Sequence, residues 1–304
     1  MKTYLEQLIK SNKAATRAGK VAAYIPELAK VNPDGLGICV RNHDGIVCAG
    51  DSDVRFTMQS VSKPLVLILA LMDWGPEKIF EKVGKEPTGD PFNSMIRLET
   101  YKKQKPYNPM INAGAISIAS LIKGDTVDHR VRRVLGFIRE IAHNSQIEID
   151  QRVYLSEKDT GHRNRSIAHF LRAIENVEID PNDVLDVYFS QCAILVSAAD
   201  LANMAMVLAD DGKCYETGRQ LFSKSYARIA KAYMLTCGMY DGSGEFAINV
   251  GIPAKSGVGG GIMGAVPGKM GIGVYGPALD DKGNSVAGIQ MLNTMSQDFD
   301  LHIF

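Results

Sequence analysis

The sequence predicts an α+β fold in which an antiparallel sheet, built from both ends of the chain, carries a large helical insertion. Three observations support this fold class. Short β-prone runs flank an Asp-Gly turn at residues 44–45. Short, glycine-punctuated runs of the same kind return at residues 253–275. Between them, from about residue 60 to 240, the patterns are mostly helical and strand signals are scarce.

The first elements follow from apolar spacing and turn chemistry. Apolar residues recur at helical spacing over residues 21–29, so a helix is expected there before the Asn-Pro-Asp-Gly break at 32–35. Residues 36–41 and 46–49 flank the turn 42–45, which predicts a β-hairpin. The sheet therefore begins near residue 36.

The remaining elements are expected in two groups. The helical segments are the apolar run after Lys63 and residues 112–122, 127–142, 167–174, 184–192 and 198–209. The C-terminal group consists of strands at 253–258, 261–266 and 270–275, followed by a closing helix at about 286–295.

The chain is expected to form a single domain, residues 1–304, because it shows no internal repeat, low-complexity tract or Pro/Ser-rich linker. Within it we expect an α/β lobe of about 1–59 plus 245–304 and a helical lobe of about 60–244. A cleft between the two lobes is the natural place for a site.

The charge balance favours a small-molecule partner. Lys plus Arg number 34 and Asp plus Glu number 34, so no net field attracts nucleic acid or an anionic membrane. The longest apolar stretch, residues 65–72, is far shorter than the ~20 residues that span a bilayer. The first 20 residues are amphipathic and lack a signal-peptide core, so a cytoplasmic protein is expected.

Neither cysteines nor histidines suggest a bound metal. The five cysteines include no C-x-x-C pair, so neither a disulfide framework nor a zinc site is expected, and free thiols fit a reducing compartment. The six histidines show no metal-ligand spacing. Two G-x-G-x-x-G matches, beginning at Gly259 and Gly271, precede strand-like sequence where a dinucleotide site needs a helix. No metal or cofactor is expected.

A serine and a lysine at helical spacing are candidates for nucleophilic chemistry. The motif S-x-x-K occurs at Ser60–Lys63 and again at Ser120–Lys123, where a solvated lysine near a helix end is the ordinary interpretation. Ser60 instead stands at a helix start, since it follows the β-like residues 55–58 and Pro64 is tolerated only in a first turn. Residues three apart share a helix face, so the amine of Lys63 can reach the Ser60 hydroxyl and act as its base.

A third element strengthens this interpretation. Lys255-Ser256-Gly257 lies on a predicted strand, and S-x-x-K followed by K-[ST]-G is typical of penicillin-recognising acyl-serine enzymes. Lys255 would place positive charge beside Lys63 and lower its pKa. The backbone N–H after this strand would face Ser60 as an oxyanion donor. The alternatives are that Ser60 is only an N-cap and that Lys255 is a solvated edge lysine.

Longer strings resemble the serine-dependent glutaminases. They are FTMQSVSKP from Phe56, NPMINAGAI from Asn108, MYDGSG from Met239 and PAKSGV from Pro253, in the same order and with similar spacing. The resemblance implies a β-lactamase/penicillin-binding-like fold. It also implies hydrolysis of L-glutamine to L-glutamate and ammonia through a glutamyl-serine intermediate, with no cofactor, in a homodimer or homotetramer.

The same resemblance implies a role for each site residue. Ser60 is the nucleophile, Lys63 is its base, and the backbone N–H groups of Ser60 and Val258 form the oxyanion hole. Asn112 with Tyr24 binds the substrate's α-carboxylate, and Glu157 binds its α-ammonium, with Asn164 nearby. Tyr188 and Tyr240 line the reacting end as catalytic phenols that relay a proton or hold the amide.

Each of these residues also has a structural explanation. Asn112 fits an N-cap, Glu157 with Lys158 fits a surface ion pair, Tyr24 fits core packing on its apolar stripe, and Tyr188 and Tyr240 fit half-buried aromatics. Two other functions stay open. One is a β-lactamase or penicillin target, which the missing S-D-N motif disfavours, and the other is a non-catalytic amino-acid-binding protein.

Overall fold

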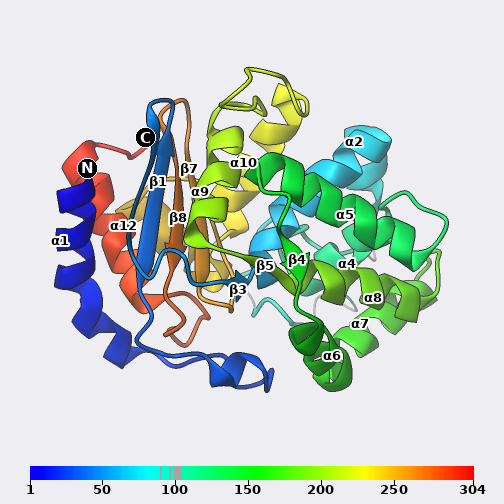
Figure 1. The fold of residues 1–304 in the computed structure, drawn as a ribbon. Helices are drawn as coiled ribbons and strands as arrows, with labels where there is room; N and C mark the ends of the chain where they lie inside the picture. The colour runs from blue at the N-terminus through cyan, green and yellow to red at the C-terminus, as the bar shows by residue number, and fades with distance from the viewer. Residues whose placement is uncertain (90, 96–97, 99–104) are drawn as a thin grey trace.

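The computed structural model describes residues 1–89, 91–95, 98 and 105–304. A five-stranded antiparallel sheet, in the order β2-β1-β8-β7-β6, stands between two sets of helices (Figure 1). Strands β1 and β2 come from the N-terminal part of the chain, and the other strands come from its C-terminal part. This arrangement confirms the predicted α+β, β-lactamase-like fold.

The bounds of the described elements are as follows. The strands are β1 (Gly37–Asn42), β2 (Gly45–Gly50), β3 (Phe56–Thr57), β4 (Glu148–Ile149), β5 (Ile194–Val196), β6 (Ala254–Ser256), β7 (Gly261–Val266) and β8 (Met270–Tyr275). The α-helices are α1 (Lys2–Asn12), α2 (Lys63–Lys82), α4 (Asn112–Ser120), α5 (Val127–Ala142), α6 (Gln151–Thr160), α7 (His162–Ala173), α8 (Pro181–Cys192), α9 (Ala198–Ala209), α10 (Lys224–Cys237), α11 (Ser243–Asn249) and α12 (Val286–Phe299). Short 3-10 helices are η1 (Lys13–Ala18), η2 (Leu28–Lys30), η3 (Gln59–Ser62) and η4 (Tyr240–Gly242).

The predicted hairpin is present, and its turn is fixed by an asparagine. The side-chain Oδ1 of Asn42 accepts hydrogen bonds from the backbone N–H groups of Asp44, at 3.0 Å, and Gly45, at 3.1 Å. β1 then pairs with β8 along its other edge, from Gly37 opposite Tyr275 to Arg41 opposite Gly271. This pairing joins the two ends of the chain in one sheet.

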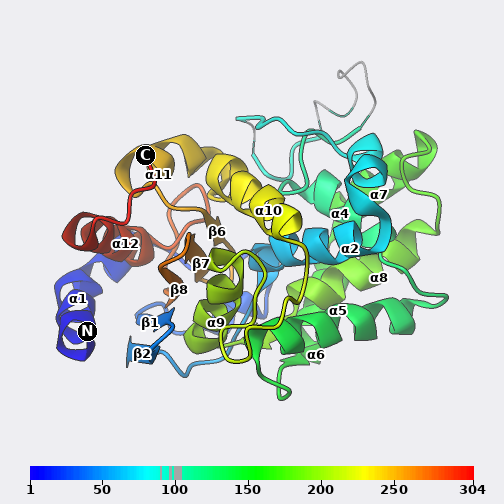
Figure 2. The same ribbon diagram turned by 90° about the horizontal axis from the view of Figure 1, so that it is seen from above.

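Helices cover both faces of the sheet. α1 and α12 pack on one face, where Leu5, Leu8, Met291 and Met295 are buried in one apolar cluster. α9 packs on the other face and separates the sheet from the helical lobe (Figure 2). A capping box of Ser197 and Asp200 begins α9. The sheet is therefore buried between helical layers.

The helix expected over residues 21–29 is wrong. Only the short turn η2 is helical there. Pro26 lies within the segment, and a residue that precedes proline is sterically biased away from helical dihedrals. Of the apolar residues at that spacing, Ile25 and Leu28 are nevertheless buried, in a cluster that also holds Val258, whereas Tyr24 and Ala29 are exposed. The two buried residues pack this irregular segment against the site.

A small second sheet, in the order β3-β5-β4, was not expected from the sequence. Its strands are two or three residues long, which is too short for an alternating pattern to be recognised. The sheet ties the residues just before Ser60 to the end of α8, since the N–H of Met58 also donates to the carbonyl of Ile194 at 2.8 Å.

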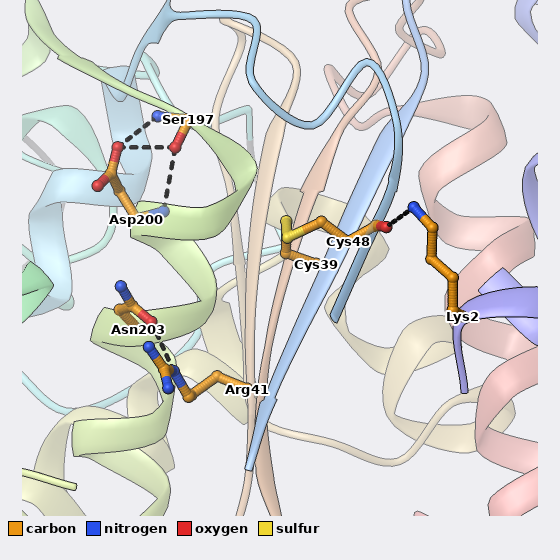
Figure 3. The surroundings of a disulfide bond; sticks show 7 residues. All are labelled: Lys2, Cys39, Arg41, Cys48, Ser197, Asp200 and Asn203. Atoms are coloured by element: carbon orange, nitrogen blue, oxygen red, sulfur yellow. Dashed lines mark hydrogen bonds between the residues drawn. A yellow bond between two sulfur atoms is a disulfide. The ribbon is translucent and has the colours of Figure 1, made fainter. Parts of the chain in front are cut away.

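The expectation of five free cysteines is also wrong. Cys39 and Cys48 face each other across the β1–β2 hairpin and form a disulfide, with their Cα atoms 4.1 Å apart (Figure 3). Directly opposite residues of antiparallel strands come this close at non-hydrogen-bonded positions. Lys2 of α1 donates to the carbonyl of Cys48 at 2.6 Å beside the bond. Cys192, Cys214 and Cys237 are free.

None of the helices in the described ranges combines the length and apolar character that crossing a bilayer requires.

Candidate active site

A pocket of about 100 Å³ lies where η3, α4, α6 and α8 meet the turn between β6 and β7. We call it the Ser60 pocket. The sequence-predicted residues that line it are Tyr24, Ser60, Asn112, Glu157, Asn164, Tyr188 and Val258. Lys63, Tyr240 and Lys255 are buried beside it. The structure therefore gathers residues that lie up to 234 positions apart in the sequence at one place.

Ser60 lies in a tight turn and does not cap a helix. η3 begins at Gln59, whose φ of 48° lies in the left-handed region, and α2 follows directly from Lys63. The hydroxyl of Ser62 donates to the carbonyl of Gln59 at 2.7 Å and holds this turn. No side-chain capping hydrogen bond is present at either helix start. A strained residue just before a candidate nucleophile is typical of functional sites.

Lys63 is 1% exposed, and two oxygen atoms accept from its amine. They are the carbonyl of Met110 at 3.1 Å and the side-chain Oδ1 of Asn112 at 2.8 Å. Burial lowers the pKa of Lys63 to about 8, and the nearby Cys192 and Glu157 oppose this shift. A neutral amine has two N–H groups and one lone pair. Since the two acceptors take both N–H groups, the lone pair is left for a third neighbour.

Glycines let the end of β6 press against this turn. A Cβ atom on Gly257 would lie 2.5 Å from the carbonyl oxygen of Met58, and one on Gly259 would lie 2.2 Å from that of Thr57. Only residues without a side chain fit there. The backbone of Val258, between the two glycines, is thus held beside the turn that carries Ser60.

Lys255 is fully buried and supports Tyr240. Its amine donates to the carbonyls of Gly238 at 2.9 Å and Ser256 at 2.6 Å, and lies 4.4 Å from the centre of the Tyr240 ring. These contacts exclude a solvated edge lysine. They also revise the expected electrostatics: burial, followed by the charge of Lys63, lowers the pKa of Lys255, whereas the pKa of Lys63 falls through burial alone.

Tyr240 is held in an unusual backbone conformation, with a φ of 55°. Its hydroxyl is buried and makes no well-aligned hydrogen bond to the described residues. Burial raises its pKa, and the Ser60 hydroxyl and the backbone of Val258 partly offset that rise. The phenol therefore stays protonated and lies close to both groups.

Glu157 is 6% exposed and does not form a surface pair. Lys158 instead pairs with Asp186 at 2.6 Å. Burial raises the pKa of Glu157 to about 8, and Gln59 and the charge of Lys63 act against that rise. Its Oε2 atom is buried with no hydrogen-bond partner among the described residues. A buried, unpaired carboxylate oxygen in a pocket can receive a cationic group.

Asn112 and Asn164 form a short chain of amides that begins at Lys63. Asn112 is the first residue of α4, whose N-cap is Ile111, so it does not cap the helix. Its Nδ2 donates to the Oδ1 of Asn164 at 3.0 Å, while its Oδ1 accepts from Lys63. The chain thus links the candidate base to the far wall of the Ser60 pocket.

Tyr24 and Tyr188 do not fit the structural roles that the sequence alone suggested, a core residue and a half-buried aromatic. Tyr24 is 58% exposed, so it is not a core residue, although burial of its hydroxyl raises its pKa, with Tyr240 and Glu157 adding to the rise. Tyr188 is buried, and burial raises its pKa as well. Both hydroxyls keep their protons near neutral pH.

Eight residues of the pocket wall were not predicted as site residues from the sequence, among them Gln59, Phe92 and Cys192. Gln59 adjoins Ser60, and Cys192 follows Tyr188 by one helical turn and so shares its face of α8. The positions of Gln59 and Cys192 relative to these predicted site residues could therefore have identified both from the sequence. Phe92 lies outside every motif, and only its contact with the Tyr240 ring, at 4.9 Å between centroids, reveals it.

Curated relatives resemble the whole chain. A glutaminase of Alkaliphilus metalliredigens is 51% identical, and glutaminase 2 of Clostridium perfringens is 50% identical; each alignment covers all of both chains.

Solved structures of glutaminases also resemble the whole chain. A probable glutaminase of Bacillus subtilis has a TM-score of 0.93 at 39% identity, covering 100% of this chain and 97% of that one. Mglu in its glutamate form has a TM-score of 0.95 at 37% identity, covering 100% of this chain and 69% of that one. The family model for glutaminase matches residues 19–304. As the sequence motifs predict, the chain belongs to the glutaminase family.

Proposed function

We propose that the protein hydrolyses L-glutamine to L-glutamate and ammonia through a glutamyl ester on Ser60, with Lys63 as the base. The observation that carries this proposal is the environment of Lys63. It is buried, its two N–H groups are taken by Met110 and Asn112, and it is one turn from the Ser60 hydroxyl. The relatives' names and the similarity to Mglu in its glutamate form support glutamine as the substrate.

In the first half-reaction, Ser60 Oγ attacks the side-chain amide carbon of glutamine. Lys63 takes the hydroxyl proton as the C–O bond forms. The backbone N–H groups of Ser60 and Val258 bind the oxyanion. The C–N bond then breaks, and the proton held by Lys63 passes to the leaving nitrogen, directly or through the Tyr240 phenol, so that ammonia departs and Lys63 is neutral again.

In the second half-reaction, a water molecule attacks the glutamyl ester. Lys63 removes a proton from the water, the C–Oγ bond breaks, and the proton returns to Ser60. Glutamate leaves and the resting site is restored. The reaction uses the same base and the same oxyanion donors in both halves.

The charges of the pocket suit an amino-acid substrate. We infer that the α-ammonium of glutamine pairs with the unpartnered Oε2 of Glu157, while Asn112 and Asn164, with the Tyr24 hydroxyl, bind the α-carboxylate. Tyr188 packs beside the substrate. A cation at Glu157 favours its ionised form, and the two opposite charges largely cancel at Lys63.

A substrate panel tests the proposal. Release of ammonia and glutamate from L-glutamine is measured beside L-asparagine and a chromogenic β-lactam. Rapid turnover of glutamine alone is the expected result. Turnover of the β-lactam without glutamine would favour a penicillin-type enzyme, and no turnover of any compound would favour a binding protein.

Glu157→Gln is expected to raise KM for glutamine about 10- to 100-fold with a smaller effect on kcat, because a charge-assisted hydrogen bond is lost. The kcat/KM ratio between glutamine and 4-carbamoylbutyrate, which lacks the α-amino group, is the sharper readout. The wild type should prefer glutamine strongly, and the variant should lose that preference. An unchanged preference would contradict the assignment of Glu157.

Lys255→Met is expected to lower kcat more than it changes KM, because Tyr240 loses the amine that supports its ring. Lys255 acts here as a positioning residue. The kcat of the variant should fall most for substrates with poor leaving groups, which depend on proton donation. Equal losses for good and poor leaving groups would indicate only a damaged fold.

Location and assembly stay predictions. The disulfide between Cys39 and Cys48 removes the free-thiol argument for a reducing compartment, and a cytoplasmic location stays a prediction. The expected homodimer or homotetramer rests on the family resemblance.

A further inference from the structure

A second cavity, of about 380 Å³, adjoins the Ser60 pocket. We call it the side cavity. Its walls are residues 18, 20–24 and 279–283, together with Phe92 and Val258. Tyr24, Phe92 and Val258 line both spaces, so the two share a boundary. A pocket that needs to hold only ammonia as a leaving group does not require this extra space.

The walls of the side cavity are well ordered by hydrogen bonds. Lys20 and Leu279 exchange two backbone hydrogen bonds, each 2.9 Å long. The Oδ1 atom of Asp280 accepts from the backbone N–H groups of Lys282, at 3.0 Å, and Asn284, at 2.8 Å. The two segments thus form a fixed frame around the opening.

The side cavity lies at the reacting end of the Ser60 pocket. A Cβ atom on Gly283 would lie 3.5 Å from both the Tyr240 ring and the Val258 side chain. Asp280 is close enough to raise the pKa of Tyr240. Of the residues assigned to the amino-acid end, Tyr24 borders this space, whereas Glu157, Asn112 and Asn164 do not line it. A substituent on the amide nitrogen of a bound glutamine would therefore point toward it.

The charges of the side cavity favour a cation. Its charged lining residues are Lys20, Asp280, Asp281 and Lys282. Lys282 already pairs with Glu245 at 3.2 Å, outside the cavity wall. With Lys282 paired, the two carboxylates of Asp280 and Asp281 are balanced only by the charge of Lys20. The resulting negative charge attracts amines that carry a positively charged tail.

We propose that the side cavity binds the amine part of γ-glutamyl amides, so that the protein also transfers the glutamyl group from Ser60 to primary amines, preferring amines with a second positive charge. This inference rests on the proposed acyl-serine function. In the transfer, the neutral amine attacks the ester carbon in place of water. A C–N bond forms, the C–Oγ bond breaks, and the amine proton passes through Lys63 to Ser60.

The experiment supplies glutamine with ethylenediamine, methylamine or glycine at about pH 9, and each amide yield is divided by the concentration of the neutral amine, because the neutral fraction differs between the three. The γ-glutamyl amide and free glutamate are quantified by mass spectrometry. The amide-to-glutamate ratio should be highest for ethylenediamine and lowest for glycine. Glutamate formation without any amide would overturn the inference and leave hydrolysis intact, whereas no glutamate would instead reject the proposed function.

Matched variants locate the subsite. Ala18 is exposed on the cavity wall, so Ala18→Trp should fill the cavity and lower transfer to ethylenediamine about tenfold while glutamine hydrolysis is unchanged. Ala14, on the same 3-10 helix, does not line the cavity, and Ala14→Trp should change neither reaction. Equal transfer by both variants would overturn the assignment.

Asp281→Asn tests the charge preference. The variant should lower transfer to ethylenediamine and leave transfer to methylamine unchanged, because only the cationic tail meets this carboxylate. If both transfers fell together or neither changed, the proposed preference for a second positive charge would be rejected.

Discussion

Ser60→Ala is expected to lower kcat for glutamine by about 10⁴-fold or more, since losing a nucleophile removes the covalent pathway entirely. KM should change little, because the residues proposed to bind the amino-acid end remain in place. The measurement is ammonia release by the purified variant beside the wild type. Thermal unfolding of both proteins shows whether the fold is intact.

The chain offers a matched control for this variant. Ser120 belongs to the second S-x-x-K motif, lies at the end of α4, and donates to the carbonyl of Ser117 at 2.7 Å. Ser120→Ala should leave kcat unchanged. If Ser60→Ala retained more than a few per cent of wild-type activity, a different nucleophile would have to be sought.

Lys63→Met is the second large effect, with an expected loss of about 10²- to 10⁴-fold in kcat, the usual contribution of a general base. The pH dependence gives the sharper test. Only the neutral amine accepts a proton, so the wild-type rate should rise with pH through about 8, the lowered pKa of Lys63. An unperturbed lysine, near 10.5, would give almost no neutral amine at that pH.

The variant should lack this rising limb. Lys123→Met, in the second motif, should keep it, since Lys123 lies over the Trp74 ring at the surface, with its amine 4.6 Å from the ring centre. A wild-type rate that stays flat between roughly pH 6 and 9 would argue against lysine as the base.

The fold was largely predictable because its elements carry strong local signals. α5, α9, β7 and β8 begin and end as the sequence predicts, and each combines a clear apolar pattern with a clear turn or cap. β3 falls within the β-like residues 55–58, but β4 and β5 were missed because two or three residues carry no periodicity. At residues 21–29 the apolar spacing looks helical, but Pro26 biases the chain away from helical dihedrals, and only Ile25 and Leu28 of that stripe are buried.

The disulfide was missed although the hairpin prediction contained it. With a turn closed by Asn42 and Gly45, residues whose numbers add to the same sum face each other, and this places Cys39 opposite Cys48. The cysteines were considered only by their number and spacing. Placing them on the predicted strand register would have identified the pair.

The site was only partly predictable. Ser60, Lys63 and Lys255 stand out through motifs that a chemical argument can interpret. Asn112, Asn164, Glu157 and the tyrosines needed the family resemblance, because each becomes part of the site only through long-range packing. The burial that perturbs Lys63 and Glu157, and the side cavity next to the Ser60 pocket, arise from contacts between distant segments.

The central claim is that Ser60, and no other pocket residue, carries the glutamyl group. A free thiol, Cys192, lines the same pocket and is the competing nucleophile. Burial raises the pKa of Cys192 well above its ordinary value, so it should stay protonated and unreactive.

The most direct test uses 6-diazo-5-oxo-L-norleucine, an electrophilic glutamine analogue that has been seen in complex with the probable glutaminase of Bacillus subtilis. The protein is treated with the analogue, digested, and mapped by peptide fragmentation in a mass spectrometer. We predict one covalent label, on Ser60, in the wild type and none in Ser60→Ala. An active wild-type enzyme that carries the label on Cys192, or takes none at Ser60, would contradict the account.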